Sequence, residues 1–303
     1  MEMWVGPAPW QVRYGAHRMT ACMFASDLHG HTSRYEKLFA AIRSERPHMV
    51  FLAGDLLPSG LGELAHQGGG YADFFSEYLV PGLNSLKGEL SGSFPEILLI
   101  LGNDDPRGAE DDFLAEEGLW HYVHGRRHAC QGFTTFGYGF VPPTPFLFKD
   151  WERYDVSRYV PPGCVSPEEG FRSLEVDDHW VRYGTIQKDL EELVGDADMR
   201  RAILLCHTPP YDTALDRAAL DGRMVDHVPL DLHVGSIAVQ RFIAARQPTV
   251  ALHGHIHESA RITGSWRDMV GKTHVFSAAH DGPELALVRF DLERPEGATR
   301  VLL

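Results

Sequence analysis

The chain has 303 residues, a formal net charge of -14 and 44% hydrophobic residues, which allow one large α/β domain with a substantial core. The acidic balance and the lack of a long basic run argue against a broad surface for nucleic acid or anionic membranes, because both recruit dense patches of lysine and arginine. No apolar run approaches the ~20 residues needed to span a bilayer.

The N-terminal segment is predicted to be peripheral to the domain. Residues 1–18 carry Pro7, Pro9 and Gly15 and precede Met19, which directly abuts the first predicted strand. We therefore expect an extension over residues 1–18 and a single domain over 19–303. Since no basic start is followed by an apolar stretch, we predict no signal peptide and a cytoplasmic location.

Five short apolar runs are predicted to be strands. They are rich in Val, Ile and Leu and lack strict alternation, which is typical of strands buried on both faces. Apolar residues at helical spacing follow the first run over 34–45, and Ser236 begins a predicted helix over 237–246 that Pro248 ends. This alternation of strands and helices predicts parallel pairing. The five runs are residues 19–26, 48–54, 96–102, 201–207 and 248–254.

The C-terminal part of the chain shows a different pattern. Three apolar runs, residues 273–279, 284–292 and 299–303, are separated by turn residues without a helix. We expect these strands to form a second sheet that is mixed or antiparallel.

The segment 141–182 combines prolines with aromatic residues, and its composition is too aromatic for a disordered linker. We therefore predict a loop-rich, folded insertion at about these residues. In it, Trp151 or Tyr154 could stack on a ring of a substrate, and Arg153 or Arg158 could pair with phosphate. Packing of the insertion over the sheet edge is an alternative of at least equal weight.

The four cysteines show no paired short spacing, and two of them lie inside apolar runs. We therefore expect reduced thiols rather than disulfides or metal ligands. The cysteines are Cys22, Cys130, Cys164 and Cys206.

Residue types that bind metals stand directly after the apolar runs. Because sites in open α/β sheets are built at the carboxyl ends of the strands, we expect these side chains to lie together. A dinuclear centre needs one carboxylate that bridges both ions, and neutral donors that leave net positive charge for a phosphate. Each motif alone is weak, but their conjunction predicts such a centre, with His253 as a supporting histidine rather than a ligand. The candidate ligands are Asp27, His29, Asp55, Asn103, His207, His255 and His257.

The ordered set D-x-H, G-D, G-N-x-D, H and G-H-x-H, from about Ala25 to Glu258, resembles the calcineurin-like metallophosphoesterase superfamily. The stretches SDLHG, LGNDDP and LHGHIHES are most similar to its small prokaryotic phosphoesterases of the Icc-related type. The resemblance implies an α/β fold, a four-layer α/β/β/α sandwich of two mixed sheets flanked by helices. It also implies two ligand sets that share one carboxylate. These are Asp27, His29, Asp55 and His257 for one metal ion, and Asp55, Asn103, His207 and His255 for the other.

One position departs from the superfamily pattern. Many members carry a histidine after the asparagine, thought to protonate the leaving group, whereas this chain has Asp104. An unperturbed aspartate, with a pKa near ~3.9, is a poor general acid unless burial or a neighbouring anion such as Asp105 raises its pKa. We slightly favour a hydrogen-bonded or solvated carboxylate over a catalytic acid. His31 is the other candidate catalytic residue, with a surface position at a helix start as an equal alternative; His233 and His280 are interpreted as structural or solvated.

The sequence predicts a metal-dependent phosphoesterase in which a hydroxide bridging two metal ions attacks a small phosphorylated substrate. A phosphodiester is favoured, because a missing acid histidine matters least when the leaving group departs easily. A phosphomonoesterase and a nuclease with the same centre are alternatives. From another class, a superfamily member in the retromer coat uses the fold as a protein-binding scaffold, but here every ligand position is filled. The two ions are divalent or trivalent, and these donors accept manganese, iron, zinc, cobalt or nickel.

Overall fold

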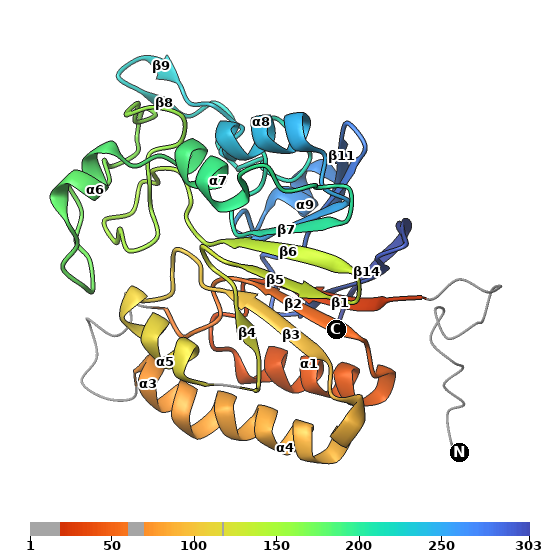
Figure 1. Cartoon of the computed structure of the whole chain (residues 1–303). Coiled ribbons are helices and arrows are strands. Elements are labelled where there is room, and N and C mark those ends of the chain that lie inside the picture. Colours follow the sequence, from red (N-terminus) through yellow and green to blue (C-terminus); the bar gives the residue numbers. More distant parts are fainter. Residues whose placement is uncertain (1–18, 60–69, 117) are drawn as a thin grey trace.

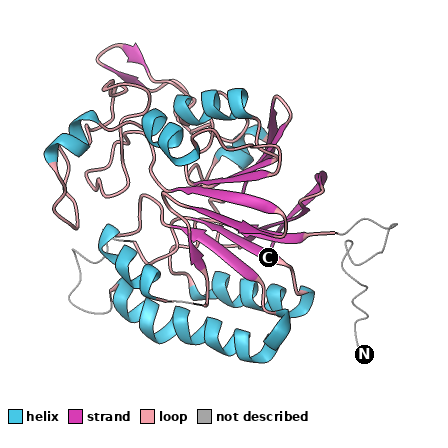
Figure 2. Cartoon of the chain, viewed as in Figure 1, coloured by secondary structure: helices cyan, strands magenta, loops and turns pink. Residues whose placement is uncertain are grey.

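The computed structural model describes residues 19–59, 70–116 and 118–303, so the predicted extension over 1–18 lies outside the described residues. Two six-stranded sheets face each other in the middle of the molecule (Figure 1), and a separate two-stranded hairpin lies at one end. Helices cover the outer face of each sheet (Figure 2), which confirms the expected four-layer α/β/β/α sandwich.

The first sheet has the strand order β14-β13-β1-β2-β3-β4. Strands β1 to β4 run parallel to one another, and β13 and β14 add an antiparallel pair beside β1. The strands are β1 (Ala21–Ala25), β2 (Met49–Ala53), β3 (Glu96–Ile100), β4 (His121–Tyr122), β13 (Ala286–Asp291) and β14 (Arg294–Leu302).

The second sheet has the strand order β11-β12-β10-β7-β6-β5. Its four inner strands are parallel, and its two edge strands are antiparallel to their neighbours. The strands are β5 (Arg127–Cys130), β6 (Phe133–Tyr138), β7 (Ala202–Cys206), β10 (Val250–His253), β11 (Arg267–Val270) and β12 (Thr273–Ser277). The separate hairpin consists of β8 (Met224–Val225) and β9 (Val228–Pro229).

Two groups of helices form the outer layers (Figure 1). Ser236 caps α8 as predicted, because its side chain accepts a hydrogen bond from the Val239 amide. Over the first sheet lie α1 (Thr32–Glu45), α3 (Tyr71–Asp73), which continues through a π-helical stretch (Phe74–Leu79) into α4 (Val80–Leu90), and α5 (Glu110–Ala115). On the side of the second sheet lie α6 (Asp178–Tyr183), α7 (Ile186–Val194), α8 (Ile237–Arg246) and α9 (Ser259–Thr263). Short 3₁₀ turns occupy Ser91–Ser93 and Arg107–Ala109.

The central strands are buried on both faces, as their composition predicts. Alternate residues point in opposite directions, so Phe24, Phe51 and Leu98 belong to the apolar layer between the two sheets. Their neighbours, such as Val50 and Leu99, belong to the core that includes the helices. Two apolar layers therefore hold β1, β2 and β3 in place and fix the positions of the loops at their carboxyl ends.

The prediction of one separate C-terminal sheet is wrong. Strand β12 pairs in parallel with β10 in the second sheet, whereas β13 pairs antiparallel with β1 in the first. The C-terminal strands therefore divide between both sheets. Local apolar runs predict that a strand forms, but its partner is chosen by long-range packing that the runs do not encode.

The segment 141–182 folds as loops with isolated strand-like pairs around a buried centre. The Val141 amide donates to the Trp151 carbonyl at 2.8 Å, and the Arg153 amide donates to the Val141 carbonyl at 3.0 Å. Trp151 is 0% exposed and Tyr154 is 2% exposed, so both are core residues. The suggestion that either ring stacks on a substrate is therefore wrong.

The two arginines suggested for phosphate binding are engaged elsewhere. Arg153 Nε lies 2.5 Å from Asp189 Oδ2, and its guanidinium covers the Trp180 ring. Arg158 Nη2 lies 2.5 Å from Glu168 Oε1. Both arginines are therefore interpreted as residues that stabilise the insertion rather than as phosphate ligands.

The remaining sequence expectations concern the thiols and the membrane. All four cysteines are free, and Cys22 and Cys206 are buried, as predicted. Among the described residues, every helix is too short or too polar to span a lipid bilayer.

A buried ion pair anchors the insertion and yields a testable prediction. Lys149 Nζ lies 2.6 Å from Glu152 Oε2, and both side chains are at most 1% exposed. Replacing Lys149 with Ala leaves Glu152 buried without its partner, so we expect the free energy of unfolding to fall by about 3–5 kcal/mol. Urea denaturation measures this change. The exposed pair of Arg200 and Asp198 supplies the control, because Arg200→Ala should change stability by less than ~1 kcal/mol. Equal effects of the two substitutions would contradict the structural role of Lys149.

Candidate metal centre

The seven candidate ligands come from loops that follow five strands of both sheets. Asp27 and His29 follow β1, Asp55 follows β2, and Asn103 follows β3. His207 follows β7 in the second sheet, and His255 and His257 follow β10. The structure links these side chains through the contacts described below, although residues from the two ends of this set are more than 200 positions apart in the sequence.

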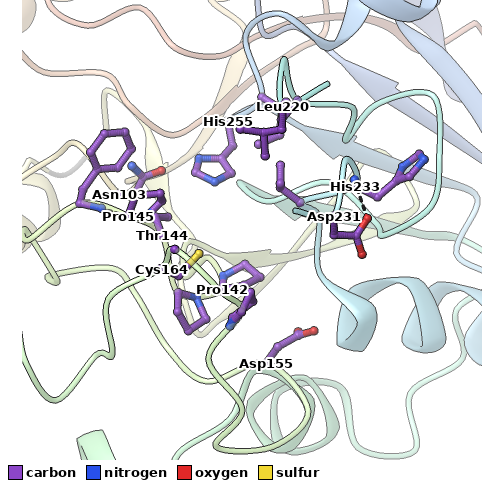
Figure 3. Close-up of a pocket in the computed structure, with 18 of the residues that line it drawn as sticks. Asn103, Pro142, Thr144, Pro145, Asp155, Cys164, Leu220, Asp231, His233 and His255 are labelled. Atoms are coloured by element: carbon purple, nitrogen blue, oxygen red, sulfur yellow. Dashed lines mark hydrogen bonds between the residues drawn. The ribbon is translucent and has the colours of Figure 1, made fainter. Parts of the chain in front are cut away.

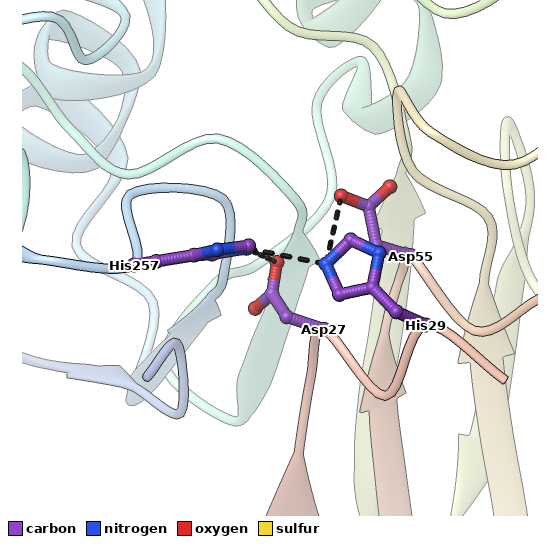
Figure 4. Close-up of side chains that lie close together, drawn as sticks. All are labelled: Asp27, His29, Asp55 and His257. Carbon is purple, nitrogen blue, oxygen red and sulfur yellow. Dashed lines mark hydrogen bonds and ion pairs between the residues drawn. The ribbon is translucent and has the colours of Figure 1, made fainter. Parts of the chain in front are cut away.

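Asp27, His29, Asp55 and His257 form one group (Figure 4), in which one ligand atom from each residue lies within 4.8 Å of the others. His29 Nε2 lies 3.3 Å from His257 Nε2 and 3.9 Å from Asp55 Oδ2. His257 Nε2 lies 3.2 Å from Asp27 Oδ1. When a metal ion binds its ligands at about 2.0–2.2 Å, the ligand atoms lie about 3–4 Å from one another. The distances within this group therefore fit a single ion.

A second group surrounds His207, which is completely buried. Its Nε2 atom lies 3.3 Å from Asp55 Oδ2 and 3.1 Å from Asn103 Oδ1, and its ring centroid lies 5.2 Å from that of His255. On the other side of the ring, Nδ1 donates to the Ala53 carbonyl at 2.6 Å. This hydrogen bond fixes the ring and leaves Nε2 directed at the carboxylate. Asp55 therefore contacts residues of both groups.

Four of the candidate ligands have a left-handed backbone, which non-glycine residues adopt infrequently. The φ angles are 55° at Asp27, 48° at His29, 52° at Asp55 and 74° at His255. Such conformations cost free energy and cluster at functional sites, where the surrounding structure enforces them. The folded chain therefore maintains an uncommon loop geometry where the predicted ligands lie.

Glycines of the motifs make room for the ligands. A Cβ atom at Gly102 would collide with Asp55 Oδ1 and would lie 2.7 Å from His207 Nε2. A Cβ atom at Gly254 would lie 2.6 Å from Asp27 Oδ2. Side chains at either position would push the carboxylates away from the histidines, so the glycines in G-N and G-H are required by the site's geometry.

The electrostatics of the site favour a bound cation. Burial alone would raise the pKa of Asp55. The charge of His207 and its hydrogen bond with Asp55 instead lower this pKa to about 2. Burial likewise disfavours the charged form of Asp27, and the contacts with His257 lower the pKa of that carboxyl below its ordinary value. Both carboxylates are therefore ionised at neutral pH in a buried position, where an ion without a counter-charge is costly.

The histidines respond to the same carboxylates. Burial would lower the pKa of both His207 and His29. The charge of Asp55 instead raises the pKa of His207 to about 9, and the hydrogen bond from His29 to Asp104 raises the pKa of His29 to about 9. Burial and the charge of His207 lower the pKa of His255 to about 3, which leaves that ring neutral. The carboxylates that stabilise protons on two histidines would stabilise metal cations in their place. Two buried carboxylates, an amide and four imidazoles thus fit divalent transition-metal ions.

Asp104, which occupies the position of the usual histidine, contacts the candidate ligand His29. Its Oδ2 lies 3.1 Å from His29 Nδ1, and its Oδ1 accepts a hydrogen bond from Ser59 at 2.7 Å. Its own amide donates to Asp55 Oδ1 at 2.8 Å. A carboxylate on the second nitrogen of a metal-binding histidine orients the ring and increases its basicity. This arrangement supports a hydrogen-bonded carboxylate at Asp104 over a catalytic acid.

Asp105 has a role that the sequence did not predict. Its buried carboxylate accepts hydrogen bonds from the amides of Leu56 at 3.1 Å, Leu57 at 2.7 Å and Gly102 at 2.9 Å. It therefore ties the loop after Asp55 to the loop that carries Asn103. Burial and the charge of Asp55 raise the pKa of Asp105 to about 7, while these amides oppose the rise. Its place in the G-N-x-D block was the only sequence signal.

The other four histidines considered from the sequence lie outside the two groups. His31 is an exposed residue at the N-cap position of α1. His253 is buried, and its Nδ1 lies 2.9 Å from the Thr208 carbonyl and 3.2 Å from the Cys206 carbonyl, as expected for a supporting residue. His233 Nδ1 lies 2.8 Å from Asp216 Oδ1, and His280 Nε2 lies 3.0 Å from Glu284 Oε2.

A cavity of about 960 Å³ opens directly onto the candidate ligands (Figure 3). His29, Asp55, Asn103, His255 and His257 line one part of it. The rest is lined mainly by the segments 142–164 and 211–235, which lie far apart in the sequence. The cavity provides room for a substrate beside the site.

Comparison with known proteins agrees with this geometry. The family model for calcineurin-like phosphoesterases matches residues 22–259. No curated protein sequence matches the chain. The crystal structure of TT1561 of Thermus thermophilus is similar with a TM-score of 0.53 and 17% identity, covering 94% of this chain and 99% of that one. This likeness shows a shared fold.

Two further solved structures have lower scores. One is a dimetal phosphatase from Danio rerio, with a TM-score of 0.46, 12% identity and coverage of 89% of this chain and 95% of that one. The other is an archaeal phosphodiesterase, with a TM-score of 0.40, 11% identity and coverage of 93% and 99%, respectively. The family model, which spans every candidate ligand, decides the assignment. The chain therefore belongs to the calcineurin-like phosphoesterase family and is a metal-dependent phosphoesterase.

Proposed function

We propose that the protein hydrolyses a phosphodiester at a dinuclear metal centre. Asp27, His29, Asp55 and His257 would hold one ion, and Asp55, Asn103, His207 and His255 would hold the other. The observation that carries the proposal is the position of Asp55, whose Oδ2 atom lies 3.9 Å from His29 Nε2 and 3.3 Å from His207 Nε2. Two bound ions would stabilise the charge of the phosphoryl transition state and supply a hydroxide nucleophile at neutral pH.

The protein's own residues position this chemistry. Asp104 fixes the orientation of His29, the Ala53 carbonyl fixes that of His207, and Asp105 joins the loops that carry Asp55 and Asn103. Since the oxygens of Asp104 face His29 and Ser59, we do not assign it the task of protonating a leaving group. This supports a phosphodiester whose leaving group needs little help, in preference to a phosphomonoester.

A nuclease and a non-catalytic scaffold have less support. A nuclease would need cationic side chains for the nucleic-acid backbone, and no lysine or arginine stands among the described residues that line the cavity. A non-catalytic scaffold would not need two ionised carboxylates buried among histidines.

His31 stays an exposed candidate for contact with a substrate oxygen. The free cysteines support the proposed cytoplasmic location, because disulfides are rare in a reducing compartment.

A substrate panel tests the proposed reaction. Phosphomonoesters, linear and cyclic phosphodiesters and nucleoside polyphosphates are compared with protein loaded with manganese, iron, zinc, cobalt or nickel. The proposal expects the highest kcat/KM for a phosphodiester. A preference for phosphomonoesters under every metal would contradict the assignment to diesters while leaving the metal centre intact.

The role of Asp104 gives a prediction with two distinct outcomes. Replacing Asp104 with Asn removes the charge beside His29, so we expect metal affinity and activity to fall by about 10–100-fold. The loss should be the same for esters with good and with poor leaving groups. A general acid would instead cause a loss of about 10²–10⁴-fold that is confined to poor leaving groups.

The measurement is kcat/KM over a series of leaving groups, with metal content determined for each protein. Asp112→Asn, an exposed substitution of the same type in α5, is the control and should behave as the wild type. A steep loss restricted to poor leaving groups at full metal content would show that Asp104 is the acid.

A further inference from the structure

The cavity beside the metal centre has apolar walls. Five prolines of the insertion line it, and they are Pro142, Pro143, Pro145, Pro161 and Pro162. Leu220 and Leu230 line it from the segment 211–235, and Ile237 lines it from the start of α8. Apolar contacts of this kind stabilise a ligand by removing its apolar surface from water. Rigid proline walls also lose little conformational entropy when a ligand binds.

Among the described residues, no fixed positive charge lines the cavity away from the candidate ligands. Its described lining contains no lysine or arginine. An anionic group beyond the reacting phosphate would therefore enter without a counter-charge and would lose its hydration.

Two acidic residues line the cavity, and one of them disfavours a further anionic group on the substrate. Asp231 Oδ2 accepts a hydrogen bond from Tyr211 at 2.7 Å, and Asp155 Oδ2 accepts one from the Ile237 amide at 2.8 Å. Figure 3 shows Asp231 and Asp155 in the part of the cavity away from Asn103. Asp155 also accepts hydrogen bonds from Ser236 and from the Ala238 amide at the start of α8, which compensate its charge. Asp231 is therefore the carboxylate that would repel a second phosphate or a carboxylate on the substrate.

The apolar lining continues to the outer surface. Phe146 is 57% exposed, Tyr159 is 66% exposed and Val228 is 49% exposed, and all three line the cavity. Phe146 and Tyr159 belong to the insertion and Val228 belongs to β9, so two separate segments contribute exposed apolar side chains to the cavity. Exposed apolar groups gathered at a cavity indicate a surface that a ligand covers.

We infer that the substrate is a phosphodiester with an uncharged, predominantly apolar ester group of several carbon atoms, which occupies this cavity while its phosphate lies at the metal centre. The inference rests on the proposed phosphodiesterase function and adds the chemical class of the substrate. An alkyl chain and an aromatic ring share the required chemistry. Nucleotides with additional phosphates are excluded by the charge of Asp231.

A series of esters with one leaving group tests the inference. Methyl, butyl, hexyl and benzyl esters of p-nitrophenyl phosphate all release p-nitrophenol, so differences in kcat/KM report the contacts of the remaining group. Because a fully buried methylene changes an equilibrium by at most about four-fold, we expect kcat/KM to rise about two- to four-fold per methylene up to hexyl. The benzyl ester distinguishes a ring from a chain. A 5-carboxypentyl ester, matched in length to hexyl, should react at least ~10-fold more slowly than hexyl.

A binding measurement separates this inference from the proposed reaction. Tributyl phosphate and trimethyl phosphate are uncharged triesters, and their binding to metal-free protein is measured by calorimetry. We expect tributyl phosphate to bind more tightly by at least about ten-fold, because its chains add apolar surface that the cavity can cover. If no ester is hydrolysed under any metal, the proposed function fails, and calorimetry still decides the character of the cavity.

Substitutions at the exposed rim locate the effect. Phe146→Ser and Tyr159→Ser should each reduce the preference for hexyl over methyl, measured as the ratio of the two kcat/KM values, by about three- to ten-fold. Tyr183→Ser is the matched control, since Tyr183 is 49% exposed and is not one of the residues lining the cavity. Equal kcat/KM across the ester series, or equal binding of the two triesters, would overturn the inference.

Discussion

Replacing Asp55 with Asn should abolish the simultaneous binding of two metal ions. Asp55 is 3% exposed and is the carboxylate that contacts His29 of one group and His207 of the other. An ionised carboxylate can donate one oxygen to each of two cations, whereas a neutral amide offers one good donor oxygen and no charge. The substitution therefore removes both the bridge and a negative charge from the centre.

The loss of the second ion should also reduce hydrolysis. If the metal pair contributes at least about 4 kcal/mol to stabilising the transition state, kcat falls by at least about 10³-fold. Elemental analysis of the purified variant measures metal content, and turnover of an activated phosphodiester measures the rate. Asp112→Asn serves as the control, because that side chain is exposed in α5. Two tightly held ions in Asp55→Asn would rule out the bridging role.

His207→Ala and His257→Ala should each remove a different ion. His207 Nε2 lies 3.1 Å from Asn103, and His257 Nε2 lies 3.2 Å from Asp27, so the two histidines belong to opposite groups. A site that loses one of its four ligands binds its ion more weakly, while the other site keeps its full set. Because the reaction requires both ions, we expect each substitution to reduce kcat by about 10²–10⁴-fold.

Anomalous diffraction from manganese-loaded crystals distinguishes the two variants. The peak beside Asn103 should disappear in His207→Ala, and the peak beside Asp27 should disappear in His257→Ala. His179→Ala, an exposed substitution in α6, should keep both peaks. Loss of the same peak in both histidine variants would show that the ligands are wrongly divided between the ions.

Local patterns in the sequence predicted the parallel pairing and the convergence of the ligands, whereas the four layers were implied by the family resemblance. Strands such as β2 are short and apolar throughout, and parallel pairing brings their carboxyl ends to one edge. Asp55 and His207 are 152 positions apart, yet each lies within two residues of the end of such a strand. Strand order was harder, since β13 and β12 have similar composition but pair in different sheets.

Side-chain roles outside the strand ends could not be read from composition. Trp151 and Arg153 were plausible substrate contacts by residue type, but one is fully buried and the other pairs with Asp189. Asp105 links two loops through hydrogen bonds from three amides, and its place in the G-N-x-D block does not reveal these partners. Conversely, only the fold shows that the prolines of the insertion line the cavity beside the metal centre.

Reconstitution of chelated protein tests the central claim most directly. Protein stripped of metal should hydrolyse no phosphoester, and titration with manganese should restore phosphodiester hydrolysis. The dinuclear proposal predicts that the activity reaches its plateau when two ions are bound per chain, as determined by elemental analysis of the same samples. Full activity in the stripped protein, or a plateau at one bound ion, would contradict a reaction that depends on two metals held by Asp55 and its neighbours.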